Sequence, residues 1–492
     1  MKKRNLFFAG LALSMAFAST TANAEGLKHM RSSIYSVLVN SNEQNTRLDK
    51  EAQDADAAAY KEALAGSGLK SLGEIPGLVF PKLGIPEQFN NHNLEIRVVD
   101  FDALSSGISE EQAKEARPKG GEAGKMLKGM AAQQMGGNSS IVRVEKVDDY
   151  MHAVVNKFID DNKVAPWMVA TWYNYNPERK PQFNEEVIME RGLDNASAAE
   201  LSKAAANDDA KAMLSAQGFE LLNNTYLVAT NLRFRNNKAL AKEISELAGS
   251  AVATGAAAAG GGALGGLAAM GAKKAAEAAT NALMKDAYSV TAVTNLYKLD
   301  WNNDIDEQLA EKVLYNENAT IEDLINSGVC KLTYVGQTKA RSGVKKDKTK
   351  TLADLASSAT GRAIDKALAK LQVEHEAFRT TVPVSKCTDG FIYAAIGTKE
   401  GVGEGDEYEI LEQTMNKQGR IEYKKVGSAK VEKGGVWFNT TGADELIANA
   451  EGKEAEAMKA AQALGYTKFK AGKKDYTGYY LRLKKKKGKI ED

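Results

Sequence analysis

Two long segments of alternating apolar and polar residues constrain the fold of this chain more than any other feature. They are residues 225–235 and 287–299. Alternation sends successive side chains to opposite faces, so each segment is predicted to be a β-strand. The sequence Ala-Thr-Asn-Leu at 229–232 is echoed by Val-Thr-Asn-Leu at 293–296. We expect from this echo that the two strands are antiparallel neighbours in one sheet.

Helical periodicity surrounds these strands, and residues 45–64 are predicted to form one charged helix. Apolar residues recur at spacings of three and four over residues 147–159, and again from Ile364 to Phe378 on a stripe that includes His375. Short strands separated by glycine-containing turns follow at residues 382–384, 391–396, 407–411, 421–431, 436–438 and 478–483. Such a series is typical of a small closed β-barrel. We therefore predict the α+β class, with a central α/β sandwich-type domain followed by a small C-terminal SH3-like β-barrel.

A chain of 492 residues is long enough for roughly two to four domains. Changes in composition and periodicity divide it into five predicted segments. They are a signal peptide (1–24), a mixed α/β N-terminal segment (25–102), a Gly/Ser/Lys-rich linker (103–140), the central α/β domain (141–380) and the SH3-like barrel with a basic tail (381–492). The central domain carries an Ala/Gly-rich insertion at residues 247–272.

The first segment has the features of a secretory signal. Residues 2–4 are basic, residues 6–18 are apolar, and Ala22-Asn-Ala24 provides small residues at a cleavage site. We expect cleavage after Ala24 and export to the periplasm or the outer-membrane periphery of a Gram-negative-type cell. Because no cysteine follows the apolar run, we expect no lipid anchor at this end.

Composition and motifs argue against most kinds of chemistry. Lys and Arg together number 65 against 64 Asp and Glu, so no overall positive field favours nucleic acid. Four histidines and two cysteines leave little material for a metal centre, and no familiar nucleophile, zinc or P-loop motif appears. Gly401-x-Gly403-x-Gly405 precedes a strand and not a helix, so it lacks the helix N-terminus that holds phosphate. We expect no enzyme activity, cofactor, metal or nucleic-acid partner.

Export would allow a disulfide between the two cysteines, Cys330 and Cys387. A bridge would close a loop of nearly sixty residues. Such a loop stabilises a fold by about 4 kcal/mol in the chain-entropy model. The alternative is two separate buried thiols, and the sequence leaves both alternatives open because it does not give the distance between the residues.

The Ala/Gly-rich insertion at 247–272 carries no charge and is long enough to span a bilayer. Gly261 and Gly265, like Gly262 and Gly266, have the spacing that lets helices approach closely. The insertion contains few large apolar side chains, however, so its favourable membrane-insertion energy is small. Two interpretations remain: a weakly helical hairpin extension, or a glycine-rich element that associates with membrane or with other copies of the chain.

Two further features have a functional and a structural interpretation each. Trp167, Trp172, Tyr173 and Tyr175 could form a stacking platform for glycans, although aromatic residues in such a cluster more often pack in a core. The basic tail, 484–489, extends a cationic patch that could touch an anionic membrane face or wall polymer, or could simply be solvated. The upstream members of that patch are Lys468, Lys470, Lys473 and Lys474.

One stretch of the chain resembles a known family. Residues 392–411 (IYAAIGTKEGVGEGDEYEIL) and 423–431 (YKKVGSAKV) are similar to the barrel of the flagellar-assembly protein T family. The order of strands, long helix and barrel also resembles that family and the curli-export lipoproteins, which carry an α/β domain of the TolB N-terminal type. The stretches 190–197 and 223–228 resemble an exported envelope family of Bacteroidales type. The lipobox cysteine of the curli-export family is missing here.

These resemblances imply scaffolding or assembly at the outer membrane and transfer no catalytic residues. The sequence therefore predicts a non-catalytic envelope scaffold that binds other envelope proteins through its barrel and sheet edges. The first alternative is a membrane-associating or pore-contributing homo-oligomer that uses residues 247–272. The second is an envelope glycan binder or hydrolase that uses the aromatic residues of 167–175.

Overall fold

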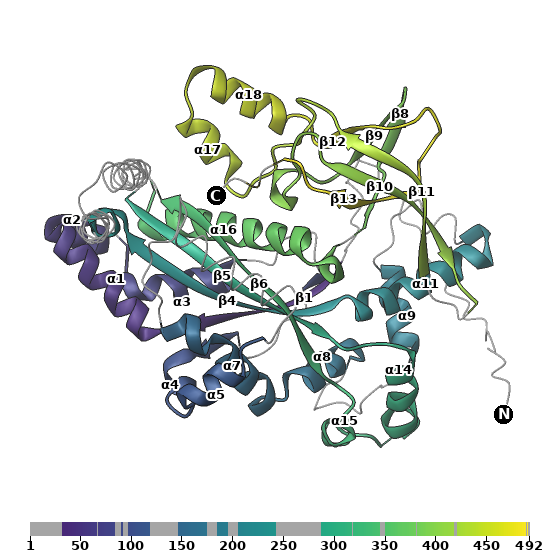
Figure 1. Cartoon of the computed structure of the whole chain (residues 1–492), viewed down its shortest axis with the longest axis horizontal. Helices are drawn as coiled ribbons and strands as arrows, with labels where there is room; N and C mark the ends of the chain where they lie inside the picture. Colours follow the sequence, from purple (N-terminus) through teal and green to yellow (C-terminus); the bar gives the residue numbers. More distant parts are fainter. Residues whose placement is uncertain are drawn as a thin grey trace, which may run out of the picture.

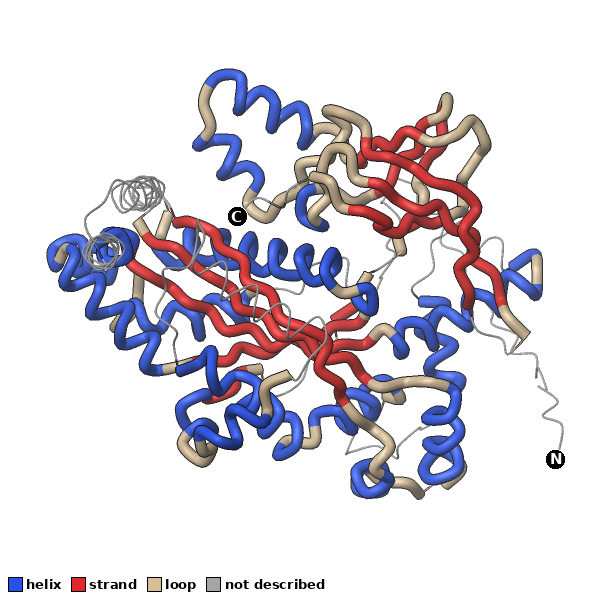
Figure 2. The backbone as a smooth tube through the Cα atoms, viewed as in Figure 1, coloured by secondary structure: helices blue, strands red, loops and turns tan. Residues whose placement is uncertain are grey.

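The computed structural model of the chain describes residues 32–65, 67–83, 90–91, 97–118, 146–174, 185–194, 205–242, 287–316, 318–344, 350–379, 381–417, 421–488 and 490. Helices and two separate β-sheets make up this part of the chain, which confirms the α+β class (Figures 1 and 2). The predicted signal peptide with its cleavage after Ala24 lies outside the described residues. So does the insertion that contains Gly261, Gly262, Gly265 and Gly266.

The first sheet has the strand order β2-β1-β4-β5-β6, and β3 also pairs with β1. Its strands are β1 (Ser33–Asn40), β2 (Asn90–Asn91), β3 (Val98–Asp100), β4 (Thr225–Asn236), β5 (Tyr288–Leu299) and β6 (Leu332–Val344). β1 runs parallel to β4, while β4, β5 and β6 are antiparallel. The two alternating segments are thus neighbours as predicted: Thr230 lies opposite Thr294, and their hydroxyl oxygens are 3.2 Å apart.

The two faces of this sheet differ in character. Even-numbered residues of β4, such as Leu232 and Phe234, are buried in an apolar cluster under helix α16 (Leu352–Glu374). The odd-numbered residues form the other face, which is apolar near the start of β4, at Leu227, and polar further along, at Asn231 and Arg233. Because side chains alternate along a strand, one strand serves both surfaces.

Helices cover both faces of the first sheet: α16 packs on the even-numbered face together with the helices of residues 42–82, and other helices cover the odd-numbered face (Figure 1). A first group comes from the N-terminal part of the chain: α1 (Asn42–Ala55), α2 (Ala57–Ala65), η1 (Leu72–Glu74), α3 (Ile75–Val79), η2 (Phe80–Lys82), α4 (Phe101–Ser105) and α5 (Glu110–Glu115). A second group is α7 (Lys146–Asp161), α8 (Val164–Trp172), α9 (Glu185–Asp194), α11 (Asp208–Asn223), α14 (Asn303–Leu309), the π-helical turn η3 (Ala310–Leu314) and α15 (Ile321–Ser327).

Two expectations for the N-terminal region need correction. The segment predicted as one helix over residues 45–64 is two helices, because Asp56 ends α1 in an extended conformation and its side chain accepts the Ala59 N–H at 3.0 Å. The expected linker at 103–140 begins with helical residues: α4 extends into it and α5 lies within it, and the rest from residue 119 lies outside the described ranges.

Helix α16 lies between the first sheet and the C-terminal region (Figure 1). It is rich in alanine, and residues on both of its sides are buried. Towards the first sheet, Ala359 and Ala363 pack in the apolar cluster. Towards the C-terminal region, a Cβ added at Gly361 would lie 2.7 Å from the Thr441 methyl carbon, so only glycine fits. Small side chains therefore let α16 make close contacts on two sides.

Basic side chains of α16 also cover the outer edge of β6. Arg362 donates to the backbone carbonyl of Gly343 at 3.2 Å, and Lys370 donates to that of Lys339 at 3.0 Å. Lys366, between them, donates to the carbonyl of Arg341 at 3.4 Å. Side chains four residues apart on the helix reach carbonyls two residues apart on the strand. Three carbonyls along the outer edge of β6 therefore already accept hydrogen bonds. This protects an edge that would otherwise pair with other strands.

The second sheet is entirely antiparallel, with the order β7-β13-β10-β11-β12-β9-β8. Its strands are β7 (Val382–Pro383), β8 (Lys386–Thr388), β9 (Phe391–Ala394), β10 (Glu407–Met415), β11 (Ile421–Val431), β12 (Thr467–Lys470) and β13 (Tyr480–Lys485). The short helices η4 (Glu376–Phe378) and η5 (Thr398–Glu400) precede and interrupt it. Helices α17 (Ala443–Asn449) and α18 (Gly452–Gln462) are inserted between β11 and β12.

The expected closed SH3-like barrel is not what the described residues form, because neither sheet is closed. β7 and β8 are adjacent in the sequence but lie at opposite ends of the sheet. Val384 donates its backbone N–H to Tyr479 at one end, and Ser385 donates to Tyr393 at the other. Because these two residues are consecutive, the sheet curls until its two ends lie side by side, although no ladder joins β7 to β8. The strand expected at 436–438 is reduced to a single bridge between Gly397 and Trp437.

Candidate functional site

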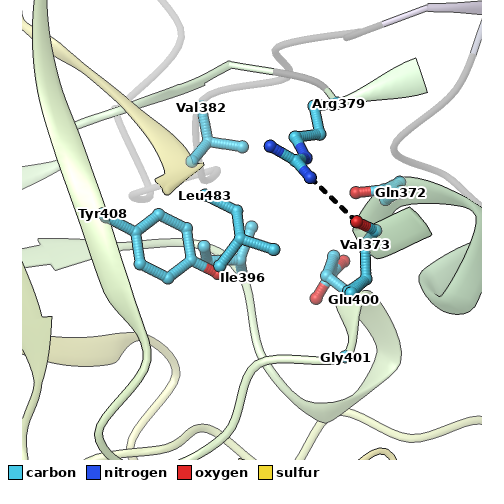
Figure 3. Close-up of a pocket in the computed structure, with 9 residues that line it drawn as sticks. All are labelled: Gln372, Val373, Arg379, Val382, Ile396, Glu400, Gly401, Tyr408 and Leu483. Atoms are coloured by element: carbon cyan, nitrogen blue, oxygen red, sulfur yellow. Dashed lines mark hydrogen bonds between the residues drawn. The ribbon is translucent and has the colours of Figure 1, made fainter. Parts of the chain in front are cut away.

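A small pocket lies where α16 ends against the second sheet (Figure 3). Val382, Tyr408 and Leu483 of the second sheet contribute its apolar side, and the end of α16 and the following turn contribute its polar side. The contact between the two is close, because a Cβ on Gly401 would lie 2.9 Å from the Cβ of Ala369. The lining residues are Gln372, Val373, Arg379, Val382, Ile396, Glu400, Gly401, Tyr408 and Leu483.

Two hydrogen-bond donors at this pocket are buried and have no acceptor among the described residues. They are the side-chain nitrogen Nε2 of Gln372, a residue that is 9% exposed, and Nε of Arg379. The guanidinium of Arg379 is held in place by a bond from Nη2 to the carbonyl of Val373 at 2.9 Å (Figure 3). Burying a donor without an acceptor costs roughly 1–3 kcal/mol, so this pocket favours a group that brings an oxygen acceptor to these donors.

The volume of the pocket limits what it can hold. It is about 20 Å³. Ligand sites for small molecules usually measure about 300–1,000 Å³, whereas a single water needs about 10–15 Å³. The pocket therefore fits one water, or one oxygen atom of a larger partner that stays mostly outside. Glu400 at its rim is already engaged, since its carboxylate accepts from Gly397 N–H and from Asn439 at 3.0 Å.

A charged network lies on the polar half of the first sheet. Asp148 of α7 accepts both Nη1 and Nη2 of Arg233, at 2.9 and 2.8 Å, and Lys339 of β6 at 3.2 Å. Burial alone would raise the pKa of Asp148, but these two cations outweigh it and lower that pKa to about 2. A second pair joins Arg235 to Glu51 of α1 at 2.8 Å. These contacts hold α7 and α1 against the sheet, so their role is structural.

A buried histidine lies one helical turn further along α7. His152 is 4.6 Å from the ring of Tyr334, edge to face, and Tyr334 is 5.4 Å from the ring of Tyr297. Burial, together with the positive charge of Arg117, lowers the pKa of His152 to about 4. The histidine is therefore neutral at pH 7 and packs as a core residue. His375, predicted to be a core residue, is confirmed as one: it is 4% exposed and packs so closely over Gly336 that a Cβ there would meet its ring at 2.1 Å.

The aromatic residues singled out in the sequence are core residues. Trp172 and Tyr173 are fully buried, and the indole N–H of Trp172 donates to the Thr225 hydroxyl at 3.1 Å. Trp167 packs against the same cluster and is partly buried, while Tyr175 lies outside the described residues. The core interpretation is thereby confirmed for Trp172 and Tyr173, which leaves neither of them a free face for a sugar.

The two cysteines are free thiols, so the structure contains the separate-thiol alternative and not the bridge. Both are partly buried: Cys330 packs against a cluster beside the first sheet, whereas Cys387 packs against the core of the second sheet. Their assignment to two different cores is the physical reason that no bridge forms. Burial raises the pKa of the Cys330 thiol to about 12.

The basic tail is anchored over its first residues and is not frayed there. Asp406, fully buried, accepts the backbone N–H groups of Gly403, Lys487 and Gly488 at 2.7–2.8 Å and the ammonium of Lys486 at 2.6 Å. The backbones of Gly403 and Gly488 touch, since a Cβ on Gly403 would lie 2.8 Å from the Cα of Gly488. The glycine-rich motif is thus a turn, as predicted, and it gives the tail its docking place.

Other kinds of site are not found within the described ranges. No three His, Cys, Asp or Glu side chains there lie close enough together to hold a metal ion. Among the helices that the structure describes, none is both long enough and apolar enough to cross a bilayer. The sequence did not identify Gln372 and Arg379, the two residues with unsatisfied donors at the pocket. Their donors lack acceptors among the described residues because the second sheet packs against α16, and no local sequence pattern indicates that packing.

Comparison with known proteins does not extend this picture. No protein-family model matches the sequence. No curated protein is similar enough to it to count as a match.

Proposed function

We propose that the protein is a non-catalytic scaffold or assembly protein of the cell envelope that docks partner proteins at the junction between α16 and the second sheet. The observation that carries this proposal is the pair of buried donors without acceptors, Gln372 Nε2 and Arg379 Nε. A partner that brings an oxygen acceptor to this pocket would satisfy a buried donor, and the gain would appear only in the complex.

The partner group is a carbonyl or carboxylate oxygen of a protein segment. Both are acceptors, and the pocket of about 20 Å³ admits the oxygen while the rest of the segment stays on the surface. A carboxylate would also gain from the charge of Arg379, because hydrogen bonds between ionised groups are stronger than neutral ones.

The neighbouring strand β7 supplies a place for the segment that carries this oxygen. β7 is an end strand of the second sheet, and its Val382 lines the pocket. An added segment can pair with an end strand, here at Val382, because Pro383 has no N–H to donate. The edge of β6 is less suited to such pairing, because α16 already occupies three of its carbonyls. We therefore place the docking site at β7 and not at β6.

The substitution Gln372→Leu tests the proposal most sharply. It removes a buried donor that makes no hydrogen bond, so we expect the free energy of unfolding to stay the same or rise. Binding of an envelope partner identified by cross-linking to the wild-type protein should weaken about tenfold, as expected for one lost hydrogen bond. A variant that is at least as stable as the wild type but binds the partner more weakly would show that this donor serves binding and not folding.

Arg379→Met and Lys453→Met form a matched pair for the charge. Each removes one cation, but Arg379 lines the pocket whereas Lys453 lies exposed on α18. We expect partner binding to be lost with Arg379→Met and retained with Lys453→Met. If the same partner binds Gln372→Leu and Arg379→Met as tightly as the wild type, the junction is not the docking site.

A further inference from the structure

The second sheet has one face that does not pack on the core. Along β9, Ile392 and Ala394 are buried, and Phe391 and Tyr393 point to the other side. The same alternation along β12 buries Phe469 and turns Lys468 and Lys470 outward. This outward face of β8, β9, β12 and the end of β11 is called here the lysine face.

Lysine and aromatic residues are interleaved on the lysine face by the strand register. In one row, Tyr393 lies between Lys386 of β8 and Lys468 of β12. In the next row, Phe391 is paired with Lys470, which is in turn paired with Lys430 of β11. Lys474 of the β12–β13 loop does not belong to this face, since its carbonyl accepts the thiol of Cys387, which packs against the core, and its Nζ donates to the Tyr479 hydroxyl at 3.2 Å.

The lysine face carries a strong local charge in a chain whose formal net charge is only +1. Acidic residues near it are Asp389 in the β8–β9 turn and Glu407 of β10, which lies opposite Lys430 and is bonded to Lys487. The ion pairs of this sheet use other cations, namely Lys425, Arg482, Lys486 and Lys487. The face itself is formed by Lys386, Lys430, Lys468 and Lys470 with Phe391 and Tyr393.

The aromatic rings of the lysine face are covered by lysine ammonium groups. Nζ of Lys468 lies 3.9 Å from the centre of the Phe391 ring, and Nζ of Lys386 lies 5.7 Å from that of Tyr393. A nucleic-acid base or a sugar would have to displace these cations in order to stack on the rings. The arrangement therefore favours attraction to anions over stacking.

The cations of this face are all lysines and none is an arginine. Arginine recognises a single phosphate or carboxylate with two parallel hydrogen bonds, whereas lysine is a compact and strongly hydrated point charge. A row of lysines with aliphatic stems against aromatic rings suits a surface of many diffuse negative charges beside an apolar layer. The headgroup region of an anionic bilayer has this character.

We propose that the lysine face binds the anionic phospholipid headgroups of a bilayer, so that the protein attaches peripherally through its second sheet. The lysines lie at the headgroup phosphates, and the rings of Phe391 and Tyr393 lie behind them. This surface is separate from the junction pocket, and the proposal does not depend on the docking of a partner protein there.

Vesicle co-sedimentation of the chain from residue 25, which contains every described residue, tests this proposal. The probes are vesicles of phosphatidylcholine alone and vesicles that also contain phosphatidylglycerol. We expect sedimentation only with the anionic vesicles, and its loss at about 0.5 M salt, where exposed charges are screened within a few ångströms. The double variant K468E/K470E should bind the anionic vesicles at least tenfold more weakly.

The matched control is K453E/K459E, which makes the same change of charge at two exposed positions of α18. It should bind as the wild type does. A second pair on the face, K386E/K430E, gives the same test with two fully exposed lysines if the first pair does not fold. Folding of each variant is checked by thermal melting.

Three results would overturn the proposal. One is equal sedimentation with neutral and anionic vesicles, which would point to apolar insertion. Another is unchanged binding by both face variants, which would place the contact elsewhere on the chain. The last is binding to a soluble polyanion such as heparin without any binding to vesicles, which would identify a polymer as the ligand.

Discussion

The two sheets of this protein treat positive charge in opposite ways. In the first sheet, Arg233 and Arg235 are 5% and 7% exposed, and each is neutralised by a carboxylate from a helix that packs on the sheet. In the second sheet, Lys468 and Lys470 point away from the core. Buried charge requires a partner, whereas exposed lysine does not. Charge therefore holds the first sheet to its helices and leaves the second sheet a surface for anions.

The largest difference in stability between the two regions should follow from replacing an aromatic residue in each. Trp172→Ala empties a fully buried site beside the first sheet and should lower the free energy of unfolding by about 3–5 kcal/mol. Phe391→Ala removes a ring from the outward face of the second sheet and should cost about 1 kcal/mol or less. Denaturant titration measures both. Equal costs would mean that the lysine face is part of a core.

Asp406 is the one place where the second sheet depends on a buried charge. Asp406→Ala leaves three backbone N–H groups and the Lys486 ammonium without their acceptor, and we expect a loss of about 3 kcal/mol. The C-terminal tail should also become sensitive to limited proteolysis. The control Asp475→Ala changes an exposed loop acid and should leave both properties unchanged.

Acid should destabilise the first sheet through His152. The pKa of this histidine is about 4 in the folded chain and 6.5 in its ordinary state. Between these values the unfolded chain takes up a proton that the folded chain does not, so stability falls as the pH drops from 6.5 to 4. The loss approaches about 3 kcal/mol at pH 4. His152→Phe should flatten this part of the pH profile, and an unchanged slope would show that other groups cause it.

The smallest effect on stability should come from the lysine face itself. Lys470→Gln should change the free energy of unfolding by less than about 0.5 kcal/mol, because it is exposed, and Lys468→Gln by about 1 kcal/mol or less, because its ammonium lies over the Phe391 ring. Chemical denaturation of each variant checks the value. A loss of 2 kcal/mol or more would give these lysines a structural role, and the contrast between the sheets would disappear.

The two thiols offer a comparison that does not depend on stability. The pKa of Cys330 is raised to about 12 by burial, so its thiolate is scarce at pH 8. Cys387 lies at the partly exposed edge of the second sheet. A colorimetric thiol reagent should modify Cys387 first and Cys330 only on unfolding. Modification of both thiols at equal rates would contradict the burial of Cys330. A protein with no reactive thiol until a reductant is added would contradict the absence of a disulfide.

The sequence predicted those strands and core residues that follow from the periodicity of a single segment. The alternation of β4 and β5, their antiparallel pairing and the core positions of His375 and Trp172 are all in the structure, although α16 ends at Glu374 and His375 itself is extended. The sequence did not place β1 beside β4, since the pair of Ser33 with Thr225 is far apart in the chain and leaves no local trace.

Other elements were missed for identifiable physical reasons. β12 has only four residues, and α18 has no buried residue, so neither shows a clear apolar period. The pocket donors Gln372 and Arg379 are polar residues whose isolation results from packing between two sheets. Half of the lysine face was visible as a basic stretch, but Lys386 and Lys430 join it only through strand pairing.

Hydrogen exchange of the chain in the presence of vesicles tests the contrast between the two sheets most directly. Anionic vesicles should slow exchange in β8, β9 and β12 and leave β4, β5 and α7 unchanged, because only the second sheet presents its charge to the outside. Neutral vesicles should have no effect on either region. Protection that appears in the first sheet, or that is absent from β9 and β12, would contradict the account.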